Sequence, residues 1–347
     1  MANTIKVAFA FLLLALFGCE GGEVHVLTGP TMGTSYTIKI IGSIDKPKLQ
    51  SQIDAELAHI NALMSTYDEQ SELSRFNQSP VSTSFPVAIE LQNVLQMSQK
   101  IHDESNGAFD VTVGPLVNIW GFGPGFTGNK IPDDGQIEEA MVRTGFRFLS
   151  LDDGRLVKSK DIYVDLSAIA KGFAVDQLAD ILDSEMVTDY LIEVGGELRA
   201  KGRNSRGEAW SVAIESPDAT GRSIYRVLEL DNMGMATSGD YRNFFEVDGV
   251  RYSHTIDPRT GWPVNHNVAS VTVIAKSAAM ADGYATAINV LGVVEGLRLA
   301  EDQNLAVLVI IKEEDGFSEQ SSAALKAYLK VDEKQTGEKE SDQGKEK

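Results

Sequence analysis

Residues 252–292 hold the densest set of structural signals in the chain, because a turn, a strand and a capped helix follow one another there. The segment HTIDPRTG at 254–261 predicts a rigid turn, since proline fixes φ, glycine accepts positive φ, and Asp and Thr bond to nearby backbone. The β-branched run at 268–275 predicts a strand. Ser277 suits the N-cap of a helix that we expect to run to about Leu291, where Gly292 stops it.

Asp282 and Thr286 are four residues apart on this predicted helix, so they share one face. A carboxylate and a hydroxyl together offer two hard oxygens to one cation, which is the chemistry that Mg²⁺ prefers. Taken alone, the pair is explained more simply as a solvated helix face, because oxygen ligands lack the characteristic spacing of a Cys/His zinc site. The turn before the helix and the rest of the chain favour the cation site.

The N-terminal segment predicts export. Lys6 precedes an apolar run at 7–17 that is too short to span a bilayer as a mature helix. The segment LFGC, which ends at Cys19, resembles the lipobox of bacterial lipoproteins, so residues 1–18 are predicted to be a signal peptide and Cys19 the lipidation site. An ordinary signal peptide is the weaker alternative, because Cys19 is the only cysteine in the chain. We expect a lipid-anchored protein on the periplasmic side of the envelope, with the inner membrane favoured.

The formal net charge of −19 argues against nucleic acid and anionic lipid as partners. Part of this charge lies in residues 331–347, which lack aromatic residues and apolar periodicity and are predicted to be a disordered tail. Residues 19–330 then form the functional domain. Helical and strand patterns interleave along it, which predicts an α+β fold of mixed or antiparallel sheets covered by helices. No GxGxxG segment follows a strand and no Walker A pattern is present, so a Rossmann sheet is disfavoured.

Four local predictions can be compared directly with the structure. Residues 24–41 alternate weakly and predict two strands joined by a Gly-Pro turn. Residues 46–64 have helical periodicity. The polar segment SELSRFN at 71–77 has the character of a serine-rich turn. Asp248-Gly249 predicts the turn of a β-hairpin.

Five longer blocks carry a family resemblance: MGTSY, GAFDVTVGPL, VDLSAIAKG, LIEVGGEL, and HTIDPRTG followed by ADGYAT. In this order they resemble the ApbE family, the FAD:protein FMN transferases, from Met32 to about Ile311. The resemblance implies a T-fold-like architecture, and an enzyme that binds FAD and Mg²⁺, passes FMN to a Thr or Ser hydroxyl of an acceptor protein, and releases AMP. The implied acceptors are subunits of membrane electron-transfer complexes, of the Na⁺-pumping quinone reductase or Rnf type.

The resemblance also implies the site residues. Mg²⁺ would be held by Asp282, Thr286 and the backbone carbonyl of Ala168, because alanine offers no side-chain oxygen. Some members have an acidic residue where this chain has Ala285. The implied FAD contacts are Met32, Tyr67, Ala108, Phe109, Asp110, Asp165, Lys171 and Ile256.

The chemistry of three side chains suits these roles. Tyr67 offers a flat face for stacking, although a half-buried core tyrosine is the commoner case. Lys171, near a helix start, can meet a phosphate, whereas most lysines lie on the surface without a ligand. His254 is the candidate general base, and its alternative role is to shape the turn. Two other functions stay open: a metal-dependent FAD pyrophosphatase, and a flavin-binding lipoprotein without catalysis.

Overall fold

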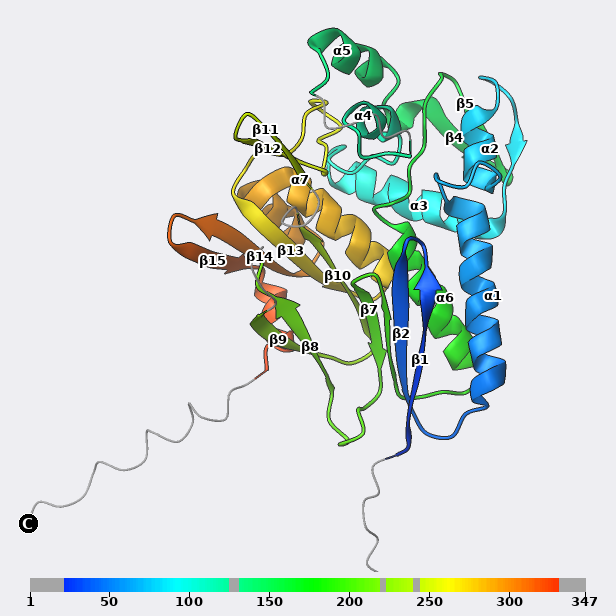
Figure 1. Ribbon diagram of the computed structural model, residues 1–347, viewed down its shortest axis with the longest axis vertical. Helices are drawn as coiled ribbons and strands as arrows, with labels where there is room; N and C mark the ends of the chain where they lie inside the picture. The colour runs from blue at the N-terminus through cyan, green and yellow to red at the C-terminus, as the bar shows by residue number, and fades with distance from the viewer. Residues whose placement is uncertain (1–21, 125–130, 219–222, 240–243, 331–347) are drawn as a thin grey trace, which may run out of the picture.

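An eight-stranded antiparallel sheet forms the centre of the computed structural model, which describes residues 22–124, 131–218, 223–239 and 244–330 (Figure 1). The strand order is β1-β2-β6-β7-β10-β13-β14-β15, and every neighbouring pair is antiparallel. The signal peptide, Cys19 and the tail lie outside the described residues. The sheet strands are β1 (Val24–Thr31), β2 (Thr34–Ile41), β6 (Tyr190–Val194), β7 (Glu197–Lys201), β10 (Met233–Gly239), β13 (Val268–Ala275), β14 (Ala306–Glu313) and β15 (Gly316–Ser321).

Helices cover one face of this sheet, so the predicted α+β fold is confirmed. Helices α6 (Ala170–Ser184) and α7 (Ala278–Asp302) pack on the strands, and α1 (Lys46–Met64) and α3 (Ile89–Glu104) pack outside them. All eight residues of β13 are buried, because both faces of this central strand are covered.

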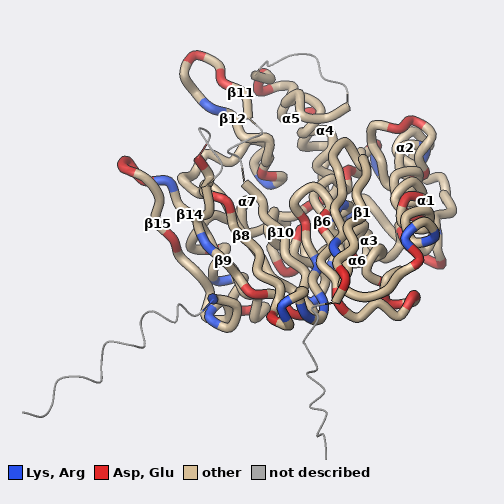
Figure 2. The backbone as a smooth tube through the Cα atoms, turned by 60° about the horizontal axis from the view of Figure 1, so that its bottom comes forward, with Lys and Arg blue, Asp and Glu red and all other residues tan. Residues whose placement is uncertain are grey.

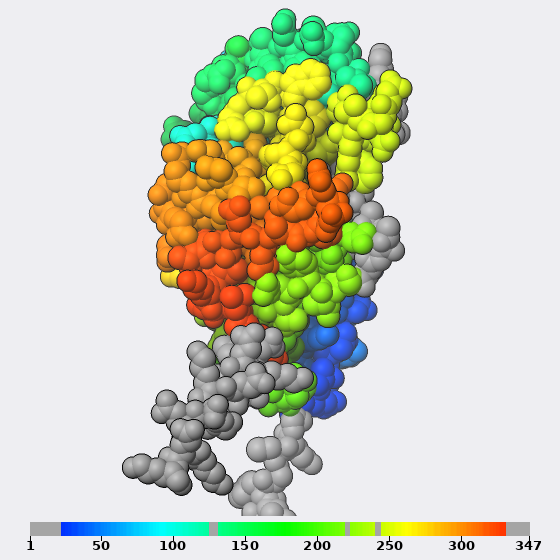
Figure 3. All heavy atoms as spheres, turned by 90° about the vertical axis from the view of Figure 1, so that its left-hand side faces the viewer, coloured from blue at the N-terminus to red at the C-terminus, as the bar shows by residue number. Residues whose placement is uncertain are grey.

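The other face of the sheet has a smaller hydrophobic cluster of its own. Ile274 of β13 and Leu308 of β14 point to this side and pack against a hairpin and the C-terminal 3₁₀ helix. Figure 3 shows the corresponding surface, where these segments lie next to one another. The covering elements are β8 (Trp210–Glu215), β9 (Ile224–Leu230) and η2 (Ala323–Tyr328).

A third hydrophobic cluster lies beyond one end of the sheet, where α4, α5 and the β11–β12 hairpin meet (Figure 1). Its aromatic side chains stack in sequence, with Trp120 against Tyr252 and Tyr252 against Phe245. The remaining elements of the described chain are α2 (Glu72–Gln78), β3 (Phe85–Pro86), α4 (Gly114–Ile119), α5 (Asp134–Val142), η1 (Phe146–Phe148), β4 (Leu149–Asp152), β5 (Arg155–Lys158), β11 (Phe244–Val247) and β12 (Val250–Ser253).

Two of the local predictions are confirmed, one is confirmed except for the place of its turn, and one is wrong. The helix at 46–64 and the Asp248-Gly249 hairpin turn form as predicted. The first two strands are joined by Met32-Gly33, both with positive φ as a type I′ turn requires, and not by Gly-Pro, which lies within β1. The polar segment at 71–77 is the helix α2 with its N-cap, because Ser71 accepts a bond from the Ser74 N–H and buried apolar side chains hold the helix.

The predicted end of the last helix is also partly wrong. Gly292 has φ of 74° and interrupts α7, as the sequence suggests, but helix resumes beyond it to Asp302. The break removes a helical donor from the carbonyl of Asn289, and His266 Nε2 donates to this oxygen at 2.6 Å instead.

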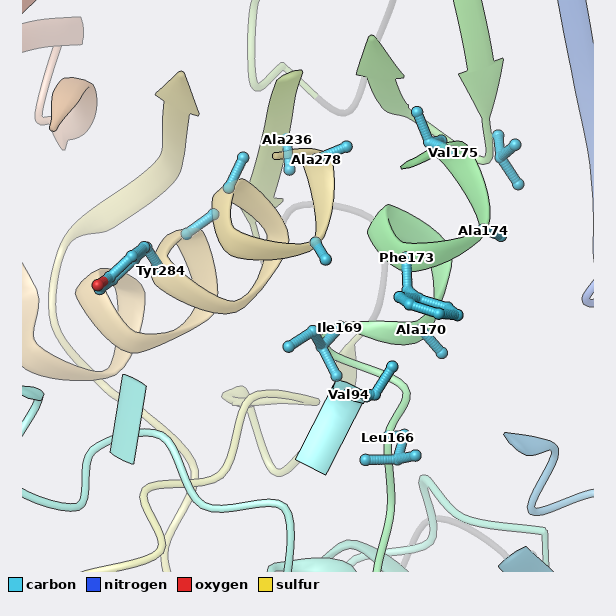
Figure 4. Close-up of a cluster of buried hydrophobic side chains, with 14 of the residues drawn as sticks. Val94, Leu166, Ile169, Ala170, Phe173, Ala174, Val175, Ala236, Ala278 and Tyr284 are labelled. Atoms are coloured by element: carbon cyan, nitrogen blue, oxygen red, sulfur yellow. The ribbon is translucent and has the colours of Figure 1, made fainter. Parts of the chain in front are cut away.

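Helices α6 and α7 approach each other so closely at their N-termini that only glycine fits between them. A Cβ at position 172 would lie 2.4 Å from the Ala278 carbonyl oxygen and 2.7 Å from the Ala279 Cα. Figure 4 shows the two helix starts side by side, with Phe173 on the first turn of α6 and Ala236 of β10 beside Ala278. This contact fixes the N-terminus of α7, and with it the first turns that carry Asp282.

Asp176 of α6 caps this end of α7 from the neighbouring helix. Its carboxylate accepts from the Ser277 hydroxyl at 2.7 Å and from the Ala278 and Ala279 N–H groups at 3.0 Å each. It also pairs with the Arg199 guanidinium at 2.6 Å. One side chain therefore ties α6, α7 and β7 together.

Asp176→Ala is expected to lower the free energy of unfolding by about 3 kcal/mol, because it removes a charged cap and leaves Arg199 half-buried without its partner. Chemical denaturation of wild type and variant measures this difference. Asp180→Ala on the exposed side of the same helix is the matched control, and we expect a change below about 0.5 kcal/mol there. Equal losses in both variants would contradict the capping role.

The helices of the described chain and the distribution of acidic residues give two further findings. No helix in the described part of the chain is long and apolar enough to cross a membrane. Acidic side chains lie on most of the elements labelled in Figure 2, in keeping with the net charge of −19.

Candidate active site

A cavity of about 50 Å³ opens where four separate segments of the chain meet. They are the 108–113 turn, the 165–168 turn before α6, the HTIDPRTG turn, and the middle of α7. The predicted site residues that line the cavity are Ala108, Phe109, Asp110, Asp165, Ala168, Ile256 and Thr286. Residues far apart in sequence are thus brought together as the cofactor prediction requires.

The HTIDPRTG turn is held rigidly at the cavity wall. The Asp257 carbonyl accepts from the Thr260 and Gly261 N–H groups, and Arg259 pairs with the Asp257 carboxylate through two nitrogens. Trp120 Nε1 donates to the Gly261 carbonyl at 2.9 Å, which ties the turn to the aromatic cluster. The predicted geometry of this turn is confirmed.

Asp110 and Asp165 are held by their own loops. Asp110 accepts from the backbone N–H and hydroxyl of Thr112, at 2.8 and 2.6 Å, and from the Phe146 N–H at 3.0 Å. Asp165 accepts from the N–H and hydroxyl of Ser167, at 2.8 and 2.5 Å. The two carboxylates therefore shape the loops at the cavity.

Tyr67 has 69% of its surface exposed, which is unusual for so large a ring. Partial burial and the nearby Asp165 carboxylate raise the pKa of Tyr67, and the same two causes raise the pKa of Tyr163. Two phenol rings thus flank one carboxylate. The Asn77 side chain fixes the backbone between Tyr163 and Asp165, because it donates to the Val164 carbonyl and accepts from the Val164 N–H, both at 2.8 Å.

Lys171, Glu197 and Asp282 form an ionisable cluster at the start of α6 and α7, in which both carboxylates are buried and Lys171 is partly exposed. Lys171 Nζ donates to Glu197 Oε1 at 2.5 Å, and the Gly172 N–H donates to Asp282 Oδ2 at 3.2 Å. Burial disfavours the ammonium, but the charges of Asp282 and Glu197 outweigh this effect and raise the pKa of Lys171. Burial and the Asp282 charge raise the pKa of Glu197 to about 7, although Lys171 opposes the shift. Burial also raises the pKa of Asp282.

The predicted cation ligands suit a hard cation. Asp282 offers a buried carboxylate, Thr286 follows one helical turn later, and Ala168 lines the same cavity as Thr286. Two buried carboxylates face one ammonium, so the net charge of the cluster is negative when both carboxyl groups are ionised. No group of three or more His, Cys, Asp or Glu side chains that could hold a metal ion occurs among the described residues. A site of one carboxylate, one hydroxyl and one carbonyl does not need such a group.

Five predicted residues lie outside the lining of this cavity: Met32, Tyr67, Lys171, His254 and Asp282. His254 is half-buried, with its ring edge-on to Phe122 at 6.2 Å between centroids, two residues before Ile256. Met32 lies at the β1–β2 turn, partly buried against the main core.

A larger cleft of about 470 Å³ adjoins the cavity and shares Asp110 and Pro258 with it. Its other lining residues are largely polar, and Arg147 and Arg259 bring positive charge. Together the two hollows make up the candidate site.

The family model described as the ApbE family matches residues 32–309 of this chain. That range contains the cavity, the ionisable cluster and the three turns that frame them. The chain belongs to the ApbE family.

Named relatives of the ApbE family match nearly the whole chain. A FAD:protein FMN transferase of Vibrio cholerae is 47% identical over 329 residues, which covers 93% of this chain and 98% of the relative. The solved structure of the flavin transferase ApbE from Vibrio cholerae has a TM-score of 0.84 and 45% identity, over 89% of this chain and all of that one. The apo flavinyl transferase ApbE of Pseudomonas stutzeri has a TM-score of 0.83 and 40% identity, over 89% and 97% of the two chains. The resemblance, the fold and the transferase class are confirmed.

Glu197, Asn77 and Tyr163 are not predicted as site residues by any of the sequence patterns above. Glu197 is the second-to-last residue of the LIEVGGEL block, and its place directly after two glycines is the only sequence signal for it. Asn77 bonds to the backbone of Val164, 87 positions later in the chain. No local sequence pattern predicts such a distant contact.

Proposed function

We propose that this protein transfers the FMN half of FAD to a Thr or Ser hydroxyl of an acceptor protein, with Mg²⁺ as the cation and AMP as the leaving product. The main observation behind this proposal is the cavity, which is lined by residues 108–110, Asp165, Ile256 and Thr286. The cluster of Lys171, Glu197 and Asp282 lies at the start of the same helix that carries Thr286. The names of the relatives support flavin transfer, and the cation, the released AMP and the acceptor residue are the proposed details.

In this reaction the acceptor oxygen forms a bond to the FMN phosphorus while the bond from that phosphorus to the AMP oxygen breaks. Lys171 presents an ammonium to the diphosphate, and His254 takes the proton from the acceptor hydroxyl. Bound Mg²⁺ supplies charge neutralisation at the diphosphate. Asp282, Thr286 and the Ala168 carbonyl would hold the cation, which would place its charge and the Lys171 ammonium at the same diphosphate.

The two hollows suit a dinucleotide better than either one alone. A cavity of about 50 Å³ is far smaller than a ligand site, which typically occupies several hundred Å³. The adjoining cleft of about 470 Å³ provides the remaining volume. The exposed ring of Tyr67 offers a stacking face for the isoalloxazine or the adenine ring of FAD.

One assay separates the proposed function from its two rivals. Protein, FAD and Mg²⁺ are incubated with and without an acceptor subunit, the products are separated on a denaturing gel, and free FMN and AMP are quantified. Flavin fluorescence that stays on the acceptor band supports transfer. Free FMN and AMP without labelled acceptor indicate a pyrophosphatase, and unchanged FAD indicates a binding protein. Subunits of the Na⁺-pumping quinone reductase or Rnf complexes are the acceptors to test first.

We further propose that Cys19 carries a lipid that anchors the protein to the periplasmic face of the inner membrane. The motif LFGC at the end of the apolar run supports this proposal. Cys19→Ser is expected to give an unprocessed or soluble exported form that still transfers FMN, because residues 20–330 are unchanged. Cell fractionation measures the result, and wild-type membrane partitioning of this variant would contradict the anchor.

A further inference from the structure

Glu197 leaves one oxygen of a buried carboxylate without a partner. Its residue surface is 4% exposed, and its Oε1 is bonded to Lys171. Its Oε2 is buried and accepts no hydrogen bond from any residue that the structure describes. A buried acceptor without a hydrogen bond costs free energy of folding, so an unpaired carboxylate oxygen such as Glu197 Oε2 points to a functional requirement.

The surrounding backbone keeps this carboxylate close to Lys171. Glu197 follows the Gly195-Gly196 turn, and a Cβ at position 195 would lie 2.8 Å from Thr34 Cγ2 and 3.3 Å from Lys171 Cδ. The turn therefore packs over the Lys171 stem and holds it against Glu197. Asp282 is 6% exposed and near enough to raise the pKa of Glu197.

When both carboxyl groups are ionised, the cluster has an excess of one negative charge, because two buried carboxylates face one ammonium; burial raises the pKa of both groups. A diphosphate that approaches Lys171 meets this excess charge in an environment where water screens it weakly. Lys171 alone therefore cannot make the site attractive to the anion. A divalent cation at Asp282 reverses the sign of the local charge.

We propose that Glu197 couples dinucleotide binding to cation binding, so that the diphosphate binds tightly only when the divalent cation is present. The inference rests on the proposed function, since it concerns the same diphosphate and cation. In this role Glu197 is a positioning residue: it holds the Lys171 ammonium and contributes the negative charge that the cation must offset.

The experiment measures FAD affinity by equilibrium dialysis, in chelator and in saturating Mg²⁺, above the Glu197 pKa of about 7. Wild type is expected to bind FAD at least about tenfold more tightly with Mg²⁺. Glu197→Gln keeps an acceptor for Lys171 but removes the charge. This variant is expected to bind FAD about tenfold more tightly than wild type in chelator, and to gain less than about threefold from Mg²⁺.

Glu193→Gln is the matched control. Glu193 lies on β6 next to the same turn and adds to the field at Lys171, but it is half-buried and accepts from the Gly196 N–H at 2.7 Å. Water screens its charge more, so the control is expected to keep the wild-type gain from Mg²⁺. Glu197→Met provides a second neutral variant, and melting temperatures show whether each variant is folded.

Opposite outcomes overturn the inference. If folded Glu197→Gln or Glu197→Met keeps the full wild-type gain from Mg²⁺, or binds FAD more weakly than wild type in chelator, Glu197 only supports Lys171 structurally. A wild type that shows no gain from Mg²⁺, or no FAD binding, also overturns it. If the wild type shows the coupling but transfers no FMN to an acceptor, the proposed function fails while the role of Glu197 stands.

Discussion

Replacing Asp282 with alanine is expected to reduce FMN transfer by at least about a thousandfold at ordinary Mg²⁺ concentrations, because the variant loses the only carboxylate of the proposed cation site. The folded state should not lose stability in proportion. Burial raises the pKa of Asp282, so its ionised form is costly in the unliganded protein. We therefore expect a melting temperature close to that of wild type.

Transfer rates over a range of Mg²⁺ concentrations measure the effect, and partial recovery at high Mg²⁺ would fit a weakened cation site. Asp302→Ala is the control, because Asp302 lies on the same helix but is exposed at its end. It should transfer FMN at the wild-type rate. Full activity of wild type in a strong chelator would refute the cation mechanism altogether.

His254→Ala is expected to slow FMN transfer by at least about a hundredfold while FAD and Mg²⁺ affinity change little, since loss of a general base typically costs about 10²–10⁴-fold in rate. The HTIDPRTG turn keeps its own bonds without this imidazole, because Trp120, Arg259 and the backbone hold it. The rate of the variant should also lose an ionisation near neutral pH that wild type shows.

FAD affinity, melting temperature and transfer rate on one preparation distinguish the base from a residue that shapes the turn. In the second case, affinity or melting temperature falls together with the rate. His59→Ala, on the exposed side of α1, should leave all three quantities at wild-type values. Near-wild-type transfer by His254→Ala would exclude both roles and point to another proton acceptor.

Local signals predicted those elements whose ends and faces are set by near neighbours in sequence. Helix α1 forms where predicted, because Asp45 caps it and its apolar residues recur with helical spacing. Ser277 caps α7 through the Met280 N–H, and the DPRTG turn closes on its own Asp257. The shared helix face of Asp282 and Thr286 follows from the same local geometry.

Short or interrupted elements were harder to predict, because distant contacts stabilise them. Helix α2 contains only seven residues, and burial of Leu73 and Phe76 against the core holds it. Gly292 breaks α7 locally, but whether the chain ends or resumes as helix depends on His266, which satisfies the freed carbonyl from outside the helix.

The sequence by itself determined the α+β class, the family and the chemical types at the site, because these depend on local patterns and on blocks that occur in order. Only the tertiary structure decided which charges share one buried volume. Lys171, Glu197 and Asp282 come from α6, β7 and α7, and Asp176 caps a helix other than its own. Such pairings depend on sheet order and helix packing, since electrostatic coupling follows distance in space and not separation along the chain.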